Sequence, residues 1–195
     1  MAETLSAEAR FEQEIKGSRF LAIAVCVTSP EDALEWLRAV QVADATHNCW
    51  AYKIGGLYRF NDDGEPGGSA GRPILSAIEG QGLDRVVCLV IRWYGGTKLG
   101  VGGLVRAYGG TAAECLRLAA RDPIVLRKSF RLELGFEFLG PAHALLEQHS
   151  AHKRDEQWQP QGVLWHVDVP EDRYASLHTA LTDATRGQMI WNDDD

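Results

Sequence analysis

The stretch RWYGGTKLGVGGLVRAYGG, residues 92–110, contains seven glycines within nineteen positions. It also carries four functional side chains, Arg92, Tyr94, Lys98 and Arg106. The stretch follows the apolar run of residues 84–93, which predicts a buried central strand, and leads into residues 103–122, whose apolar spacing predicts a long helix. Because glycine loses much conformational entropy on folding, such a cluster indicates backbone that needs unusual dihedral angles or lies close to another group.

Composition indicates an ordinary globular chain. Of its 195 residues, 45% are hydrophobic and 24% are charged, which is near the average for soluble proteins. The first twenty residues lack the basic-then-apolar order of a signal peptide, and the longest apolar run is FLAIAVCV, so we expect a cytoplasmic protein that does not enter a membrane. The four cysteines are widely spaced without a CxxC pair, so we expect free thiols rather than disulfides or a zinc site.

Positive charge is local rather than general. The formal net charge is −7 at pH 7, which disfavours a basic footprint over the whole chain. Between Arg85 and Arg106, however, there are four basic residues and no acidic one. The sequence therefore predicts a local positive patch on a mildly acidic protein.

The chain divides into two predicted domains. Fifteen of the twenty glycines lie between positions 55 and 110, and their density falls sharply after the segment DPIVLRKS, residues 122–129. We therefore predict an N-terminal domain over residues 1–126 and a C-terminal domain over residues 127–195. The second domain has the order strand, helix, strand, strand, helix, strand, which is the ferredoxin-like arrangement. These elements are expected at residues 130–138, 141–150, 154–159, 163–170, 171–184 and 187–191.

The first domain also mixes helices with strands, so the fold class is α+β. Two strands are expected to be joined at KGS, and Ser29 and Pro30 make a good start for a helix. Two further strands, separated by Gly55-Gly56, predict a hairpin. The expected elements are strands at 11–15 and 19–27, a helix at 30–41, the hairpin strands at 49–54 and 57–60, and a short helix at 72–81.

The loop between the central strand and the long helix matches no standard nucleotide fingerprint. Gly100 is followed by Val101 where a Walker loop needs Lys, and Val105 replaces the last glycine of a dinucleotide motif. What is left is a helix N-terminus near Gly102 with unshielded amides and nearby cations, which can hold an anion. The alternative is that the glycines only let a strand and a helix pack closely.

A second glycine-rich loop, NDDGEPGGSAGRP at residues 61–73, carries three carboxylates, Asp62, Asp63 and Glu65. They could accept amide hydrogens within a tight turn, pair with the cations of the other loop, or ligate a hard cation. We favour the turn and the ion pairs, and predict no metal, because nothing in the spacing enforces coordination. Ten residues are expected to organise the two loops: Asp62, Asp63, Gly64, Glu65, Gly71, Gly95, Gly96, Gly100, Gly102 and Gly103.

His47 lies just before a predicted strand, and Cys49 is the first residue of that strand. Alternate residues of a strand point to the same face, so the two side chains could lie on one face. Nucleophilic catalysis would also need a close hydrogen bond and a third orienting group. We interpret Cys49 as a buried structural residue and His47 as a surface or hydrogen-bonded one. No catalytic residue is assigned.

Three motifs, DATHNCWAY at 44–52, DDGEPGGSAGRPIL at 62–75 and RWYGGTKLGVGGLVRAY at 92–108, together resemble the IMPACT/YigZ family. The resemblance covers about residues 15 to 120 and is closest to the bacterial members. It implies an N-terminal domain like the second domain of a small-subunit ribosomal protein and a ferredoxin-like C-terminal domain similar to the fifth domain of elongation factor G. It also implies a role linked to translation, through binding of the ribosome or RNA.

The leading hypothesis is a translation-linked regulator that binds RNA or the ribosome through an anion-accepting surface of the N-terminal domain. Cations would contact phosphates, and aromatic rings would stack on bases. One alternative is an enzyme or binding protein that acts on a small phosphorylated ligand at the two loops, and another is a module that binds a protein partner. The lack of a nucleophile, base or cofactor motif disfavours an enzyme and predicts no cofactor. The residues assigned to the surface are His47, Arg72, Arg92, Tyr94, Lys98, Arg106 and Tyr108.

Overall fold

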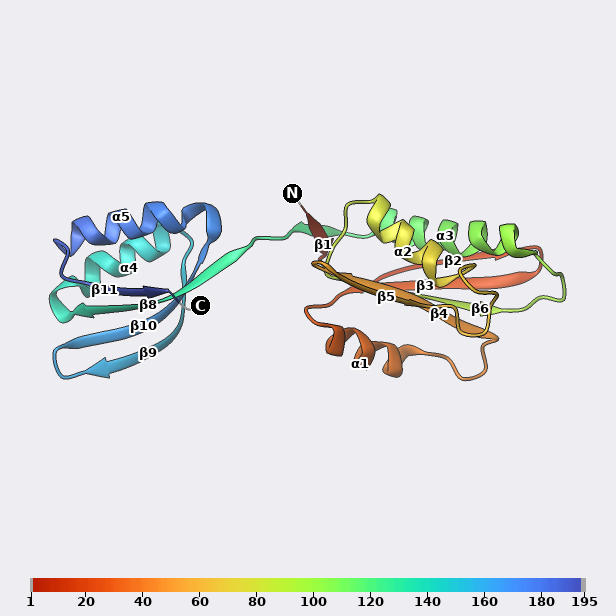
Figure 1. Cartoon of the computed structure of the whole chain (residues 1–195), viewed down its shortest axis with the longest axis horizontal. Helices are drawn as coiled ribbons and strands as arrows, with labels where there is room; N and C mark the ends of the chain where they lie inside the picture. The colour runs from red at the N-terminus through yellow and green to blue at the C-terminus, as the bar shows by residue number, and fades with distance from the viewer. Residues whose placement is uncertain (1, 194–195) are drawn as a thin grey trace. The chain divides into compact units, whose positions relative to one another are not determined.

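The computed structural model describes residues 2–193, and its contacts divide the chain into two units, one ending at Ile124 and the other beginning at Val125 (Figure 1). The boundary predicted between residues 126 and 127 lies beside this division. Each unit combines helices with an antiparallel sheet, so the α+β class is confirmed. Among the described residues, no helix has the length and apolar character needed to cross a membrane.

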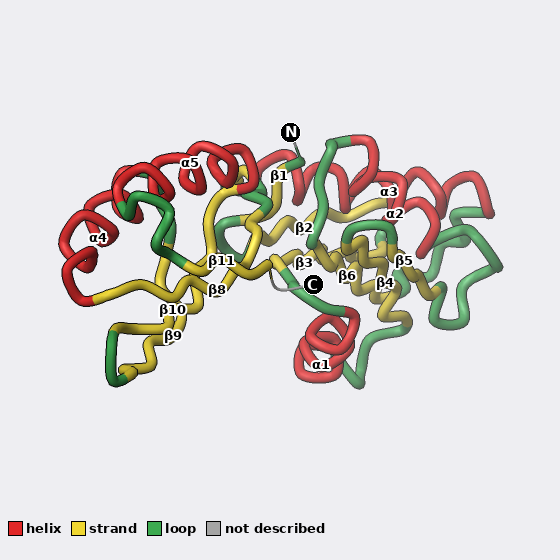
Figure 2. Tube along the Cα trace, turned by 60° about the vertical axis from the view of Figure 1, so that its left-hand side comes forward, coloured by secondary structure: helices red, strands yellow, loops and turns green. Residues whose placement is uncertain are grey.

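The first unit contains a five-stranded sheet in the order β2-β3-β6-β4-β5, in which all neighbours are antiparallel. Its strands are β2 (Ala9–Ile15), β3 (Ser18–Cys26), β4 (His47–Ile54), β5 (Leu57–Asn61) and β6 (Val86–Trp93). Helix α1 (Pro30–Val40) covers one face, and α2 (Gly71–Gly80) and α3 (Val101–Leu118) cover the other (Figures 1 and 2). The predicted strands, hairpin and three helices are all present.

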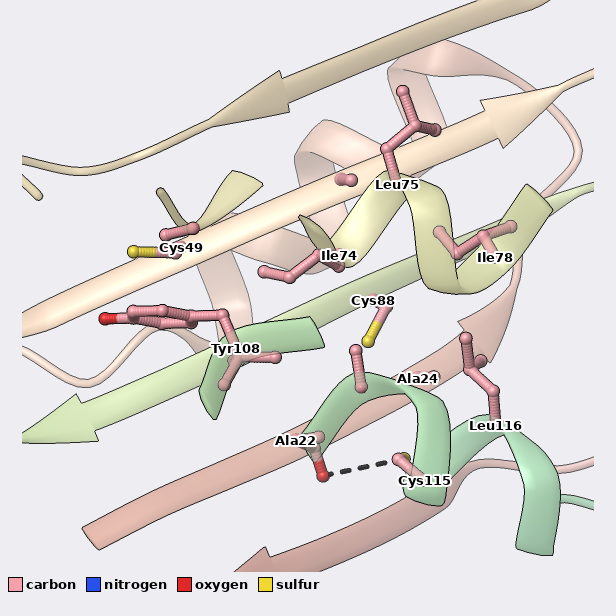
Figure 3. Packing of buried hydrophobic residues seen from close by; sticks show 14 of the residues in the cluster. Ala22, Ala24, Cys49, Ile74, Leu75, Ile78, Cys88, Tyr108, Cys115 and Leu116 are labelled. Atoms are coloured by element: carbon pink, nitrogen blue, oxygen red, sulfur yellow. Dashed lines mark hydrogen bonds between the residues drawn. The ribbon is translucent and has the colours of Figure 1, made fainter. Parts of the chain in front are cut away.

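Strand β6 is the central strand and contributes to the core on both sheet faces. Even-numbered side chains, Val86, Cys88 and Val90, join the cluster beneath α2 and α3, and odd-numbered ones, Val87, Leu89 and Ile91, join the cluster beneath α1. Figure 3 shows Cys88 between side chains of the two helices on that first face. Because side chains alternate along a strand, Arg92 continues the even series and points toward the side of α2 and α3.

A small two-stranded sheet in the first unit has no counterpart in the sequence prediction. Strand β1 (Glu3–Leu5) pairs antiparallel with β7 (Arg121–Pro123). Helix α3 therefore ends at Leu118, earlier than the predicted 122, because the following residues are extended in this pairing. A three-residue strand is too short to show a hydrophobic periodicity in the sequence. This pairing is therefore evident only where the two distant segments lie side by side in the fold.

The second unit is a four-stranded antiparallel sheet in the order β11-β8-β10-β9, which confirms the ferredoxin-like arrangement. Its helices α4 and α5 lie on one face of this sheet (Figure 1). The first strand ends at Gly135 rather than at the predicted 138, because a short 3-10 helix at Phe136–Phe138 precedes α4. The elements are β8 (Arg127–Gly135), α4 (Leu139–Gln148), β9 (His152–Gln159), β10 (Gly162–Pro170), α5 (Tyr174–Ala184) and β11 (Ile190–Asp193).

Candidate functional site

The two glycine-rich loops border one cavity of about 460 Å³ in the first unit. We call it the Glu65 cavity. Its wall comes from the start of β4, the loop before α2, the end of β6, and the loop that leads into the first turn of α3. The lining residues are Thr46, His47, Glu65, Pro66, Arg92, Tyr94, Lys98, Leu99, Gly100, Val101 and Leu104. Segments far apart in the chain thus form a shared concave surface.

Glu65 is the polar centre of this cavity, although only 4% of its side chain is exposed. Its Oε1 accepts hydrogen bonds from Arg92 Nη1 at 2.6 Å and from the Tyr108 hydroxyl at 2.7 Å. His47 Nε2 lies 3.7 Å from the same oxygen. A buried carboxylate is costly unless it is paired and hydrogen-bonded, and these contacts supply that compensation to Glu65.

Arg92 is buried, with 5% of the residue exposed, which corrects the expectation that it contacts phosphates from an open surface. Besides its pair with Glu65, its guanidinium carbon lies 5.5 Å from the Phe20 ring and 5.4 Å from the Tyr94 ring. Its Nη2 lies 3.4 Å from Ser18 Oγ, and its Nε has no hydrogen-bond partner among the described residues. Arg92 therefore forms part of the cavity wall, and its charge is compensated.

Tyr108 is fully buried, so the prediction that it stacks on bases is wrong. Its ring meets Phe20 edge to face, with centroids 5.3 Å apart, and burial raises the pKa of its hydroxyl well above its usual range. Leu104, Tyr108 and Ala112 are spaced four residues apart along α3 and are all buried. That spacing was the sequence signal that Tyr108 belongs to the core face of the helix.

His47 is oriented by the first loop. Its Nδ1 lies 2.7 Å from the carbonyl oxygen of Asp63, and because a carbonyl only accepts, Nδ1 must carry the hydrogen. The other ring nitrogen, Nε2, faces Glu65. The position of His47 follows from the sheet register, in which it lies opposite Arg92.

Cys49 is the buried residue that the sequence indicated. Its Sγ donates to the carbonyl oxygen of Asp62 at 3.0 Å, and burial raises the pKa of the thiol to about 12. A thiol in this state is a poor nucleophile. Cys49 is therefore a structural residue of the core beneath α2 and α3.

Asp62 and Asp63 organise the first loop by accepting backbone hydrogens. Asp62 Oδ1 accepts from the amides of Ala70 at 3.0 Å and Gly71 at 2.8 Å, and its Oδ2 accepts from Gly68 at 2.8 Å. Helix α2 has no side-chain cap of its own at Ala70, so Asp62 performs that role from a distance. Asp63 Oδ2 accepts from the amide of Asn48 at 2.6 Å. Within residues 2–193, no cluster of His, Cys, Asp and Glu could hold a metal ion.

Glycines at two positions permit close approach between segments. A Cβ on Gly95 would lie 1.8 Å from the carbonyl oxygen of Gly17, and one on Gly71 would lie 2.8 Å from the amide nitrogen of Asn61. Ser18, which sequence reasoning missed, completes the contact because its Oγ accepts from the Gly95 amide at 3.2 Å. Other loop glycines serve mainly through positive φ: Gly64 (83°), Gly96 (88°) and Gly100 (71°). Gly102 and Gly103 lie in the first turn of α3.

The start of α3 provides amide donors beside the cavity. Gly100 is the N-cap residue and supplies no side-chain hydrogen bond, and the first N–H groups of a helix have no acceptor within it. Lys98 and Tyr94 are exposed and line the cavity. Arg106 is exposed, and its Nη1 would lie 3.7 Å from a Cβ built on Gly102, so it reaches the same helix end.

Arg72 is not brought to the Glu65 cavity. It is exposed on α2 and lines a separate hollow of about 470 Å³ between α2 and α3, together with Pro73 and Val105. The predicted cations thus occupy three settings: Arg92 inside the wall, Lys98 and Arg106 near the start of α3, and Arg72 elsewhere. The apolar wall residues Pro66, Leu99 and Leu104 were not predicted from the sequence, because only the folded loops bring them together.

Comparisons with known proteins find relatives that cover nearly all of this chain. Residues 16–116, just over half of the chain, match the family described as the Impact N-terminal domain. An "IMPACT family member in pol 5'region" of Thermus thermophilus is 48% identical over 176 residues, which cover 90% of this chain and 97% of that protein. "IMPACT family member YigZ" of Escherichia coli is 33% identical, covering 91% of this chain and 90% of its own. A crystal structure of a hypothetical protein with 31% identity superimposes with a TM-score of 0.77 and covers 100% of this chain and 98% of its own.

Proposed function

The chain belongs to the IMPACT family, and from this membership we propose that it acts in translation by binding RNA, free or within the ribosome. The binding surface is the start of α3 and the mouth of the Glu65 cavity. Its contacts to RNA are Lys98, Arg106 and the free amides of the first turn of α3, with Tyr94 exposed beside them. A protein with this role works in the cytoplasm.

The charge balance of the cavity supports a phosphate as the bound group. The negative charge of Glu65 is compensated by Arg92, which lies 2.6 Å away. Among the charged side chains that line the cavity, Lys98 is then left uncompensated, and the positive end of the α3 dipole adds to its charge. Phosphate oxygens accept hydrogen bonds from backbone N–H groups at helix starts and from cationic side chains, and they do so in RNA of any sequence.

The single observation that carries the proposal is the uncapped start of α3 beside an exposed lysine in a concave site. Only a few phosphate contacts fit this surface, and the whole chain has a net charge of −7. Binding is therefore expected to be modest and to weaken strongly with salt.

Fluorescence anisotropy with labelled fragments of ribosomal RNA tests the proposal. Lys98→Ala and Arg106→Ala should each lower the affinity, and each should reduce the slope of log K against log salt by about 0.7, the change expected for one lost contact to a single strand. Lys53→Ala is the matched control, because Lys53 lies at the opposite end of β4 from His47 and should not alter binding. Absence of binding by the unmodified protein at low salt would remove the proposal.

A further inference from the structure

We propose that the Glu65 cavity is a pocket for one ribonucleotide, either free or at an unpaired position of an RNA strand. The phosphate lies at the start of α3, and the ribose hydroxyls face the carboxylate of Glu65. This inference rests on the proposed function for its RNA arm, and it adds a defined ligand unit and a means of telling RNA from DNA.

Two observations suit the pocket to an anionic, oxygen-rich ligand. The first-turn amides of α3 have no side-chain cap at Gly100, and Lys98 stands beside them. In addition, Arg92 lines the same cavity with more than nine-tenths of its surface buried, and its Nε has no hydrogen-bond partner among the described residues. A buried N–H without an acceptor is costly, so a ligand oxygen that reaches this atom would gain binding free energy from it.

The other end of the pocket is suited to hydrogen-bond donors. Arg92, Tyr108 and His47 all face the same oxygen of Glu65, Oε1, and none of these three contacts uses Oε2. A carboxylate oxygen with spare lone pairs accepts hydroxyl groups well, as acidic residues do toward ribose hydroxyls in dinucleotide-binding folds. A ribose phosphate has a negative group at one end and hydroxyl donors at the other, so it matches both ends of the pocket.

The remaining wall is mostly apolar, and its polar residue Thr46 already accepts a hydrogen bond from the Tyr94 amide, so the wall offers little for reading a base. Pro66, Leu99, Val101 and Leu104 line it, together with the exposed ring of Tyr94. The volume of about 460 Å³ is within the usual range for small-molecule sites. We therefore expect similar affinity for different bases, with discrimination concentrated on the phosphate and on the 2′-hydroxyl.

Isothermal titration calorimetry with the full chain tests the pocket directly. Uridine 5′-monophosphate should bind about 10-fold or more tightly than 2′-deoxyuridine 5′-monophosphate, because the deoxy compound loses a hydrogen bond to a charged carboxylate. It should likewise bind more tightly than uridine and than inorganic phosphate. Equal affinity for the ribose and deoxyribose compounds would overturn the assignment of Glu65 to the ribose.

A pair of variants at the cavity rim separates binding from folding. Val101 is 58% exposed, and an acidic residue in the first turn of a helix is favourable, so V101E should fold at least as stably as the wild type. Its carboxylate would occupy the amides and repel a phosphate, and we expect about a 10-fold or greater loss of nucleotide affinity. V101Q, of the same size but neutral, should retain most of the affinity. Equal losses in both variants would overturn the anion site.

RNA titrations distinguish this inference from the proposed function. If labelled RNA binds and excess uridine 5′-monophosphate does not displace it, RNA binding stands and the nucleotide pocket is overturned. If the mononucleotide binds and RNA does not, the pocket stands with a free nucleotide as its ligand and the proposed function falls. If the mononucleotide displaces RNA and V101E weakens both, the two are supported together.

Discussion

Arg92 Nη1 lies 2.6 Å from Glu65 Oε1, and both side chains are almost fully buried. The two residues come from different glycine-rich segments, 27 positions apart in the chain. Their ion pair therefore joins the end of β6 to the loop that precedes α2. It also places a compensated carboxylate, rather than a bare cation, at the centre of the cavity.

Breaking this pair should destabilise the first unit. Arg92→Ala leaves a buried carboxylate without its cation, and removal of one partner of a buried pair costs about 3–5 kcal/mol. The double variant Arg92→Met with Glu65→Leu should lose clearly less stability than the sum of the losses in Arg92→Met and Glu65→Leu measured singly. In the double variant neither charge is left without its partner. Urea denaturation measures the free energies of unfolding.

The exposed pair of Arg117 and Glu114 in α3 is the matched control. Arg117→Ala should change the free energy of unfolding far less, because both side chains are exposed and solvent screens this pair. If Arg92→Ala proved as mild as Arg117→Ala, the ion pair would not be the buried link described above.

The Tyr108 hydroxyl should contribute measurably to stability. Tyr108→Phe keeps the ring that packs against Phe20 and removes the hydroxyl that donates to Glu65. A hydrogen bond to a charged group contributes about 1.5–3 kcal/mol, and we expect a loss of that size in thermal or urea unfolding. Tyr58→Phe, at an exposed position on β5, should change the free energy of unfolding by close to zero. Similar effects at the two positions would contradict the role of the buried hydroxyl.

Two glycine-to-alanine substitutions should act in opposite directions. A Cβ on Gly95 would lie 1.8 Å from a backbone oxygen of Gly17, so Gly95→Ala must displace backbone, and we expect a loss of about 3 kcal/mol or more. Gly110 lies within α3 with open space around its Cβ position, so Gly110→Ala should stabilise the protein by about 0.5–1 kcal/mol. Denaturant unfolding curves of both variants, measured side by side, check the signs.

Alkaline pH should destabilise the first unit through its buried thiols. Burial raises the pKa of Cys49 and of Cys115 from 9.0 to about 12. Below pH 9.0 the thiols are protonated in both the folded and the unfolded chain, so their contribution is fully present. As pH rises from 9.0 to about 12, only the unfolded chain gains by ionising, and stability falls.

The expected loss is about 1.4 kcal/mol per pH unit for each thiol in that window. Urea unfolding of the wild type and of the double variant Cys49→Ala with Cys115→Ala, over the same pH series, measures it. The variant should show a shallower decline, although the Cys88 thiol and the Tyr108 hydroxyl, whose pKa values are also raised by burial, contribute to the decline in both proteins. Parallel curves for the two proteins would contradict the assignment to the thiols.

Most of the helices and strands could be predicted from local patterns in the chain. The unbroken apolar run of β6 identified the central strand, and Ser29 with Pro30 identified the start of α1. The order of strands and helices after residue 127 was enough to identify a ferredoxin-like unit. These features depend on local periodicity and capping, which are written in neighbouring residues.

The candidate site was only partly readable in this way. Glycine density and charge identified the two loops, but they did not reveal that Arg92 is buried or that Arg72 lies apart from the cavity. Both points depend on how the two loops pack in the folded protein. The sheet register sets His47 opposite Arg92, and the first loop places Glu65 against that guanidinium. Burial and pairing depend on which distant segments meet, and no local pattern along the chain encodes that meeting.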